Sequence, residues 1–94
     1  MRVKWLTTAL NNLENEARYI STDNPHAAEA TVRAIVDAVE NLKKYPAIGR
    51  PGRVTGTREL VVSNTPYIVP YRVRSSVIEI LRVFHGARKW PEKF

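Results

Sequence analysis

Three consecutive β-strands joined by two tight turns are predicted within residues 57–91, and this segment constrains the fold most strongly. Each strand is an apolar run, and the strands span residues 58–62, 67–73 and 77–85. Asn64 and Pro66 supply the first turn, because asparagine bonds to the nearby backbone and proline fixes φ. Strands this close in sequence pair as an antiparallel meander. The rest of the chain is therefore expected to cover one face of that sheet.

Two amphipathic helices are expected upstream of the meander, because apolar residues recur there at three- and four-residue spacing. The first helix is expected to take its N-terminal cap from Thr7 or Thr8. The second is expected to start at Asn24 and Pro25, since asparagine caps a helix and proline lacks an N–H that would be unpaired there. Pro46 ends it. The short link between the helices predicts an antiparallel hairpin.

With a short strand at Arg2–Trp5, the predicted order of elements is β-α-α-β-β-β in a single domain of residues 1–94. This order favours an α+β fold of two layers. We expect a four-stranded antiparallel sheet in the order 1-4-3-2, with the helix hairpin on one face and the first strand antiparallel to the last. Pro70 falls in an interior strand, where it cannot donate to the ladder, so a β-bulge or a break in pairing is expected there.

The composition excludes several classes of function. The chain has no cysteine, which excludes a disulfide framework, a thiolate metal site and a cysteine nucleophile. It has two histidines far apart in sequence, so no metal or cofactor is expected. The start at Met1 lacks the apolar core of a signal peptide, and no stretch nears the length that spans a membrane. A cytoplasmic protein without a membrane partner is therefore expected.

The charge of the chain is strongly and unevenly basic. Fifteen lysines and arginines against nine acidic residues give a formal net charge of +6. The excess begins at Lys43, whereas residues 1–42 are close to neutral. This pattern favours an acidic partner, such as nucleic acid, a ribonucleoprotein or an acidic protein, over a role in solubility alone.

Residues 46–56 form a second unusual segment, which we call the Gly/Pro loop. It holds three of the four glycines and two of the six prolines, together with Arg50 and Arg53. The sequence of this loop and of the meander resembles the RelE/ParE toxin superfamily and, within it, the ParE branch. The fragments that carry the resemblance are GRPGR at 49–53, RELVV at 58–62, PYIV at 66–69, ILRVFHGAR at 80–88 and Trp90-Pro91.

The resemblance implies a type II toxin that is neutralised by a co-expressed, acidic and partly disordered antitoxin of the ParD type. The ParE branch poisons DNA gyrase, and this is the expected function. The alternative is the activity of the RelE branch, which cleaves messenger RNA on the ribosome. In that case Arg82, His85 and Arg88 would be the catalytic residues.

The residues themselves weigh against a nuclease. Cleavage through a 2′-hydroxyl needs a base, an acid and cations that converge on one phosphate. Arg82 and His85 fall on opposite faces of an ideal strand. Relatives that depend on the ribosome carry a tyrosine or histidine near the C-terminus, where this chain has Trp90 and Phe94. We therefore expect no enzymatic activity. The favoured interpretation of His85 is that it bonds to the backbone beside Gly86.

Two binding surfaces are expected. The meander carries more apolar residues than one covered face needs, so an uncovered face is expected to bind the antitoxin. Its expected antitoxin-binding residues are Ile68, Ile80, Arg82 and Phe84. The expected target-binding residues are Arg50, Arg53, Arg88, Lys89 and Trp90. The plainer alternatives are a solvated turn for the arginines of the Gly/Pro loop, a salt bridge to Glu59 or Glu79 for Arg82, and a packing anchor for Trp90.

Overall fold

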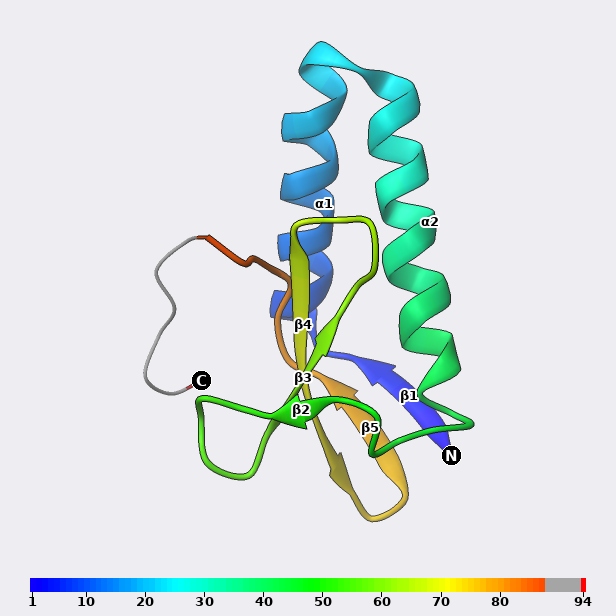
Figure 1. The fold of residues 1–94 in the computed structure, drawn as a ribbon, viewed down its shortest axis with the longest axis vertical. Helices are drawn as coiled ribbons and strands as arrows, with labels where there is room; N and C mark the ends of the chain where they lie inside the picture. Colours follow the sequence, from blue (N-terminus) through cyan, green and yellow to red (C-terminus); the bar gives the residue numbers. More distant parts are fainter. Residues whose placement is uncertain (88–93) are drawn as a thin grey trace.

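Two helices lie side by side over a mixed sheet in the computed structural model, which describes residues 1–87 and 94 (Figure 1). The helices are α1 (Thr7–Asp23) and α2 (Pro25–Asn41). The strands are β1 (Arg2–Trp5), β2 (Arg50–Pro51), β3 (Arg58–Val61), β4 (Tyr67–Arg74), β5 (Val77–Ile80) and β6 (Phe84–His85). The α+β class and the helix hairpin on one face of the sheet are confirmed.

The predicted capping chemistry is found at the start of α2 but not at the start of α1. Asn24 caps α2, and its Oδ1 accepts a hydrogen bond of 3.0 Å from the N–H of Ala27. The expected threonine cap of α1 is wrong, because Thr7 is already helical and the preceding Leu6 makes no side-chain cap bond. Among the described residues, no helix combines the length and the apolar character that crossing a bilayer requires.

The sheet differs from the expected one in its number of strands and in the direction of its first strand. Its order is β1-β5-β4-β3-β2, with β6 paired to β4, so the order 1-4-3-2 recurs as part of a larger, six-stranded sheet. The antiparallel pairing of the first strand is wrong, since β1 runs parallel to β5. Only Leu6 separates β1 from α1, which is too short a link to reverse the chain. The chain therefore continues upward into α1 (Figure 1), and every later element runs opposite to the expected direction.

A bulge opposite Pro70 divides the expected third strand into β5 and β6. Tyr71 pairs with Ile80, and Ile68 pairs with Phe84. Between these two pairs β4 contributes residues 69–70, whereas the facing segment contributes residues 81–83, one more. The predicted bulge is thus confirmed, and it sets the direction of the side chains that follow it.

The core lies between the sheet and the helices. Its buried members alternate along the strands, which places one side of each strand against α1 and α2. They are Ala9, Ile35, Val39, Leu42, Leu60, Val62, Tyr67, Val69, Tyr71, Ile78, Ile80 and Val83. The other face of the sheet carries most of the charged side chains of the strands, and much of the candidate site is built there.

Candidate functional site

The Gly/Pro loop is held against the sheet by side chains of β3 and β4. Tyr71, fully buried in β4, donates a hydrogen bond of 2.8 Å to the carbonyl of Pro46 and accepts one of 2.9 Å from the N–H of Gly49. Burial raises the pKa of the Tyr71 hydroxyl, so it remains a neutral donor. Arg58 donates to the carbonyl of Gly49 at 2.8 Å. A Cβ at Gly49 would lie 2.6 Å from the Tyr71 ring, so only glycine fits this close approach.

A buried carboxylate organises the two arginines of this loop. Glu59 is 3% exposed and is opposite Arg50 in the β2–β3 pair. Its Oε1 accepts from Nε of Arg50 at 3.1 Å, and its Oε2 accepts from the backbone N–H of Arg53 at 2.8 Å. The Arg53 Nε lies 3.6 Å from the same Oε2. Both arginine side chains remain about half exposed, at 48% and 47%. The expected target-binding arginines are therefore oriented by one carboxylate and still face solvent.

A second carboxylate repeats this arrangement on β5. Glu79 lies 2.6 Å from Nε of Arg72 and 3.9 Å from Nε of Arg74. The hydrogen bond from Arg72 holds the pKa of the Glu79 carboxyl below its usual range. The alternative salt bridge of Arg82 with Glu59 or Glu79 does not form within the described residues, where Arg50 and Arg53 pair with Glu59 and Arg72 and Arg74 pair with Glu79.

Arg82 and His85, two of the residues of the nuclease hypothesis, point to different sides of the sheet. Arg82 donates to the carbonyl of Leu81 at 2.6 Å, and its guanidinium lies 5.2 Å from the centre of the Phe94 ring. The ring of Phe84 also contacts Phe94, at 6.3 Å between centres. His85 instead pairs with Tyr67, a member of the helix-side core, and meets its ring edge-on at 5.7 Å.

His85 also satisfies one ring nitrogen locally. Its Nδ1 accepts a hydrogen bond of 3.2 Å from the N–H of Ala87, which confirms the expected backbone partner beside Gly86. The expected divergence of Arg82 and His85 is likewise confirmed by their separate neighbours. The other residues of these hypotheses, Arg88, Lys89 and Trp90, lie outside the described residues.

The prediction of an uncovered apolar face on the meander is wrong for most of the apolar residues assigned to it. Ile80 is fully buried, and it packs with Ile78 in the core under the helices. Ile68, on the other face, is 8% exposed and lies beneath the turn at Gly86, where an added Cβ would lie 3.2 Å from Ile68 Cδ1. Of the four expected antitoxin-binding residues, only Arg82 and Phe84 keep an intermediate exposure.

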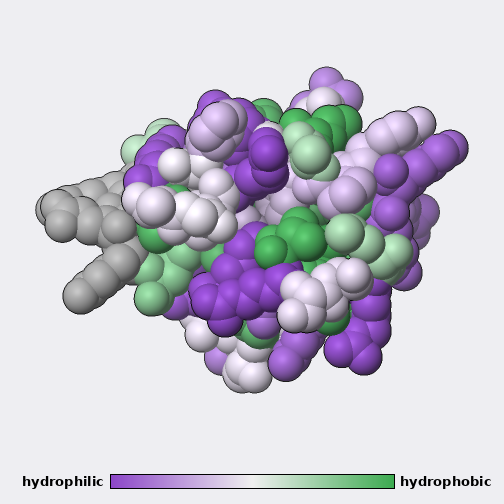
Figure 2. Space-filling view, turned by 90° about the horizontal axis from the view of Figure 1, so that it is seen from below, coloured by the Kyte–Doolittle hydropathy of each residue, from purple (hydrophilic) through white to green (hydrophobic). Residues whose placement is uncertain are grey.

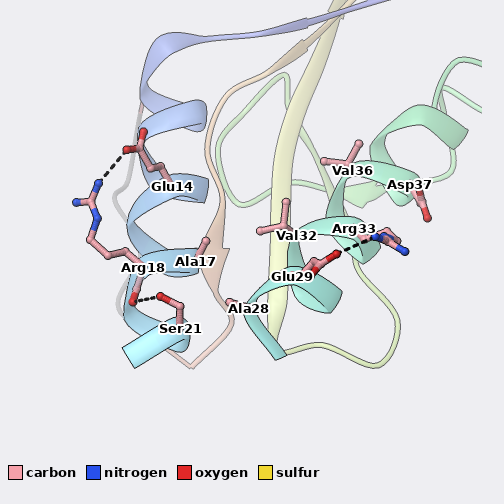
Figure 3. A pocket seen from close by; sticks show the side chains of 10 residues that line it. All are labelled: Glu14, Ala17, Arg18, Ser21, Ala28, Glu29, Val32, Arg33, Val36 and Asp37. Carbon is pink, nitrogen blue, oxygen red and sulfur yellow. Dashed lines mark hydrogen bonds and ion pairs between the residues drawn. The ribbon is translucent and has the colours of Figure 1, made fainter. Parts of the chain in front are cut away.

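A groove on the helix hairpin is an uncovered apolar surface that the sequence did not predict. This helix groove has a volume of about 660 Å³ and runs between α1 and α2 (Figure 3). Its lining residues are Glu14, Ala17, Arg18, Ser21, Ala28, Glu29, Val32, Arg33, Val36 and Asp37. Two ion pairs flank the apolar centre, Arg18–Glu14 at 2.8 Å and Arg33–Glu29 at 3.1 Å. The available signal in the sequence was Val36, an apolar residue of the second helix directly beside Ile35, so that the two side chains cannot both point into the core.

Comparison with known proteins identifies the family. The family model described as the ParE toxin of the type II toxin–antitoxin system parDE matches residues 3–90. The chain belongs to the ParE toxin family. It is 47% identical to "Putative toxin Y4kP" of Sinorhizobium fredii over 91 residues, which cover 97% of this chain and 94% of the relative. It is 36% identical to "Toxin RelE2" of Caulobacter vibrioides over 87 residues, covering 93% and 97% of the two chains.

A solved structure of the same kind supports the fold of this ParE-family toxin. A chain of the "Chromosomal ParDE TA system from P. aeruginosa" superposes with a TM-score of 0.81 at 32% identity. The superposition covers 90% of this chain and 95% of that chain. The resemblance found in the sequence is therefore confirmed at the level of the family, and the match at 3–90 includes the Gly/Pro loop, the whole sheet from Val3 onward and both helices.

Nothing in the described part of this ParE-family toxin resembles a metal centre. Within residues 1–87 and at Phe94, no three histidine, aspartate or glutamate side chains come together in a way that would hold an ion.

Proposed function

We propose that this ParE-family toxin stops growth by binding DNA gyrase and has no catalytic site of its own. The observation that carries the proposal is the placement of His85, whose Nδ1 is bonded to the backbone and whose ring packs on Tyr67, away from Arg82. A ribonuclease needs its proton-transfer groups and its cations around one phosphate. A toxin that acts by binding needs only an oriented surface, which Arg50 and Arg53 supply.

A supercoiling assay with purified gyrase tests this function. The wild-type toxin should inhibit supercoiling or trap cleaved DNA, and His85→Ala should do so equally well, because the proposal gives the imidazole no proton to transfer. Toxin that leaves gyrase unaffected at concentrations that stop growth would contradict the proposal. Loss of gyrase inhibition in a folded His85→Ala variant would show that the histidine has a direct part.

A ribosome-dependent endoribonuclease is the second candidate, and one observation favours it. The relative named RelE2 is 36% identical to this chain over nearly its whole length. Under this alternative Arg82, His85 and Arg88 would act on messenger RNA. Induced expression with separate labelling of DNA, RNA and protein synthesis distinguishes the two functions. Gyrase poisoning should first stop DNA synthesis, whereas messenger cleavage should first stop protein synthesis.

We further propose that a cognate ParD-like antitoxin neutralises the toxin by binding the helix groove and the neighbourhood of Phe84 and Arg82. The P. aeruginosa structure named as a ParDE system supports a partner of this kind. An amphipathic helix of the antitoxin would lay its apolar side chains on Val32 and Val36, the apolar centre of the helix groove. Its acidic residues would be attracted by the net charge of +6.

A charge in the helix groove should weaken this complex. Val36 is 37% exposed, so Val36→Asp should fold normally but place an unpaired carboxylate in the interface. We expect the dissociation constant for the antitoxin to rise at least about tenfold. Leu10→Asp is the matched control, since Leu10 is 48% exposed on α1 outside the helix groove. Isothermal titration with both variants, checked by circular dichroism, gives the answer. Equal affinities for folded Val36→Asp and wild-type toxin would exclude the helix groove.

A further inference from the structure

Six cationic side chains belong to the face of the sheet that the helices leave uncovered. We call this set the basic sheet surface; it comprises Arg2, Lys4, Arg50, Arg72 and Arg74 of the strands and Arg53 of the Gly/Pro loop, which reaches Glu59 on the same face. Strand register places its members together. Lys4 pairs with Glu79 and Glu79 pairs with Arg72, so one row crosses β1, β5 and β4. Arg2 and Arg74 both pair with Val77 in the next row. Paired residues share a face, and this face is opposite Ile78 and Ile80 of the core.

The carboxylates of this surface do not cancel its charge. Among the described residues, Glu59 and Glu79 are the carboxylates that pair with these cations, and each is shared between two arginines. Both are buried or nearly so, at 3% and 17% exposed, whereas Arg74 is 65% and Arg50 48% exposed. A guanidinium has five donors in a rigid fork, so an arginine held by a carboxylate through one edge can still bind an anion through another. The carboxylates therefore orient the cations and leave an excess of positive charge facing solvent.

The spacing of these cations suits a polyanion with regularly spaced charges. Adjacent strands lie about 4.8 Å apart, so Lys4 and Arg72, which flank β5, start about 10 Å apart at their backbones. The long side chains can reach successive phosphates, and duplex DNA presents about one negative charge per 1.7 Å of its axis. Figure 2 views the molecule from the end that carries the β4–β5 turn and shows strongly hydrophilic groups around a small hydrophobic patch.

Nucleic acid fits this surface better than an acidic polypeptide. A polypeptide that folds on its partner gains most of its affinity from buried apolar area. Three apolar residues on this side of the sheet, Ile68, Pro70 and Leu81, are buried, and Val61, Val77 and Phe84 keep some exposure there. Phosphate contacts need no apolar area, and arginine is the residue that binds phosphate in a bidentate manner. The helix groove has an apolar centre at Val32 and Val36, and we place the apolar side chains of the antitoxin helix there.

We propose that the basic sheet surface binds the phosphodiester backbone of duplex DNA. This inference extends the proposed function, because a gyrase poison with such a surface would contact the DNA that gyrase holds as well as the enzyme. Binding to DNA alone is nevertheless measured without gyrase. An inactive supercoiling assay together with intact DNA binding would overturn the gyrase proposal and leave this one standing.

The test is fluorescence anisotropy of a labelled duplex of arbitrary sequence, titrated with toxin at several salt concentrations. The test variant carries Lys4→Gln and Arg74→Gln, two exposed side chains of the basic sheet surface. The control variant carries Arg18→Gln and Arg33→Gln, which remove the same charge from exposed positions on the helix hairpin. Wild-type toxin should bind in the micromolar range at low salt, and the slope of log K against log salt should fall by about two units in the test variant alone.

Three results would overturn the proposal. The first is no binding of the duplex by the wild-type toxin at low salt. The second is an equal loss of affinity in both variants, which would show attraction by net charge rather than by this surface. The third is a preference for a labelled polyglutamate peptide or for single-stranded RNA over the duplex, which would assign the surface to another partner. Circular dichroism of both variants confirms that each is folded.

Discussion

Ile80→Asp should unfold the protein. Ile80 is fully buried in β5 between its neighbours β1 and β4, and its side chain lies in the core under the helices. An unpaired carboxylate there costs about 4–5 kcal/mol or more, a large part of the 5–15 kcal/mol that stabilises a typical domain. We expect the loss of the cooperative transition in urea-induced unfolding and of the native circular dichroism spectrum.

Val61→Asp is the matched control for this substitution. Val61 lies on the neighbouring part of the sheet, at the end of β3, but is 52% exposed. The closely similar change from a β-branched aliphatic residue to aspartate should there alter the free energy of unfolding by no more than about 0.5 kcal/mol. A folded Ile80→Asp variant with a stability close to that of Val61→Asp would mean that the helix hairpin does not cover this part of the sheet. Because Ile80→Asp is expected to unfold the toxin, a loss of antitoxin binding by this variant would not show that Ile80 lies in the interface.

Tyr71→Phe should destabilise the protein without changing its core packing. The substitution removes only the hydroxyl that bridges the carbonyl of Pro46 and the buried N–H of Gly49. An unsatisfied buried donor costs about 1–3 kcal/mol, so the free energy of unfolding should fall by that amount. Amide exchange at Gly49 should accelerate, because this bond anchors the Gly/Pro loop to β4. Tyr45→Phe, at a tyrosine that is 50% exposed, is the control and should have little effect.

The pH dependence of stability gives a second measure of the same hydroxyl. Burial raises the pKa of Tyr71 in the folded chain above its ordinary value of 10.0. The folded state therefore holds this proton more tightly, and the corresponding stability is complete below about pH 10 and is lost as the pH rises through the folded pKa. Denaturation curves across this range should show the alkaline loss in wild-type protein and a smaller loss in Tyr71→Phe. Identical stability of the two proteins at neutral pH would contradict the bridging role.

Local chemistry was sufficient for much of this fold. The capping of α2 by Asn24 and the bulge opposite Pro70 depend on the residue itself and its immediate neighbours, and both were predicted. The family was also evident, because GRPGR and the meander fragments are contiguous in sequence. His85 was interpreted correctly for the same reason, since its partner Ala87 is two residues away.

Contacts between distant residues were decided only by the tertiary structure. The parallel pairing of β1 with β5 depends on the path of the chain through Leu6 and two helices, which no local pattern records. Ile80 and Phe84 are both apolar residues of the strand predicted at 77–85. The helix hairpin nevertheless buries Ile80, whereas the bulge leaves Phe84 partly exposed. Glu59 was a plausible partner for Arg82, but the β2–β3 pair brings Arg50 and Arg53 to it instead. Alternation and capping specify how a segment folds, whereas the partner of a buried charge or an apolar face depends on which segments the completed sheet places beside it.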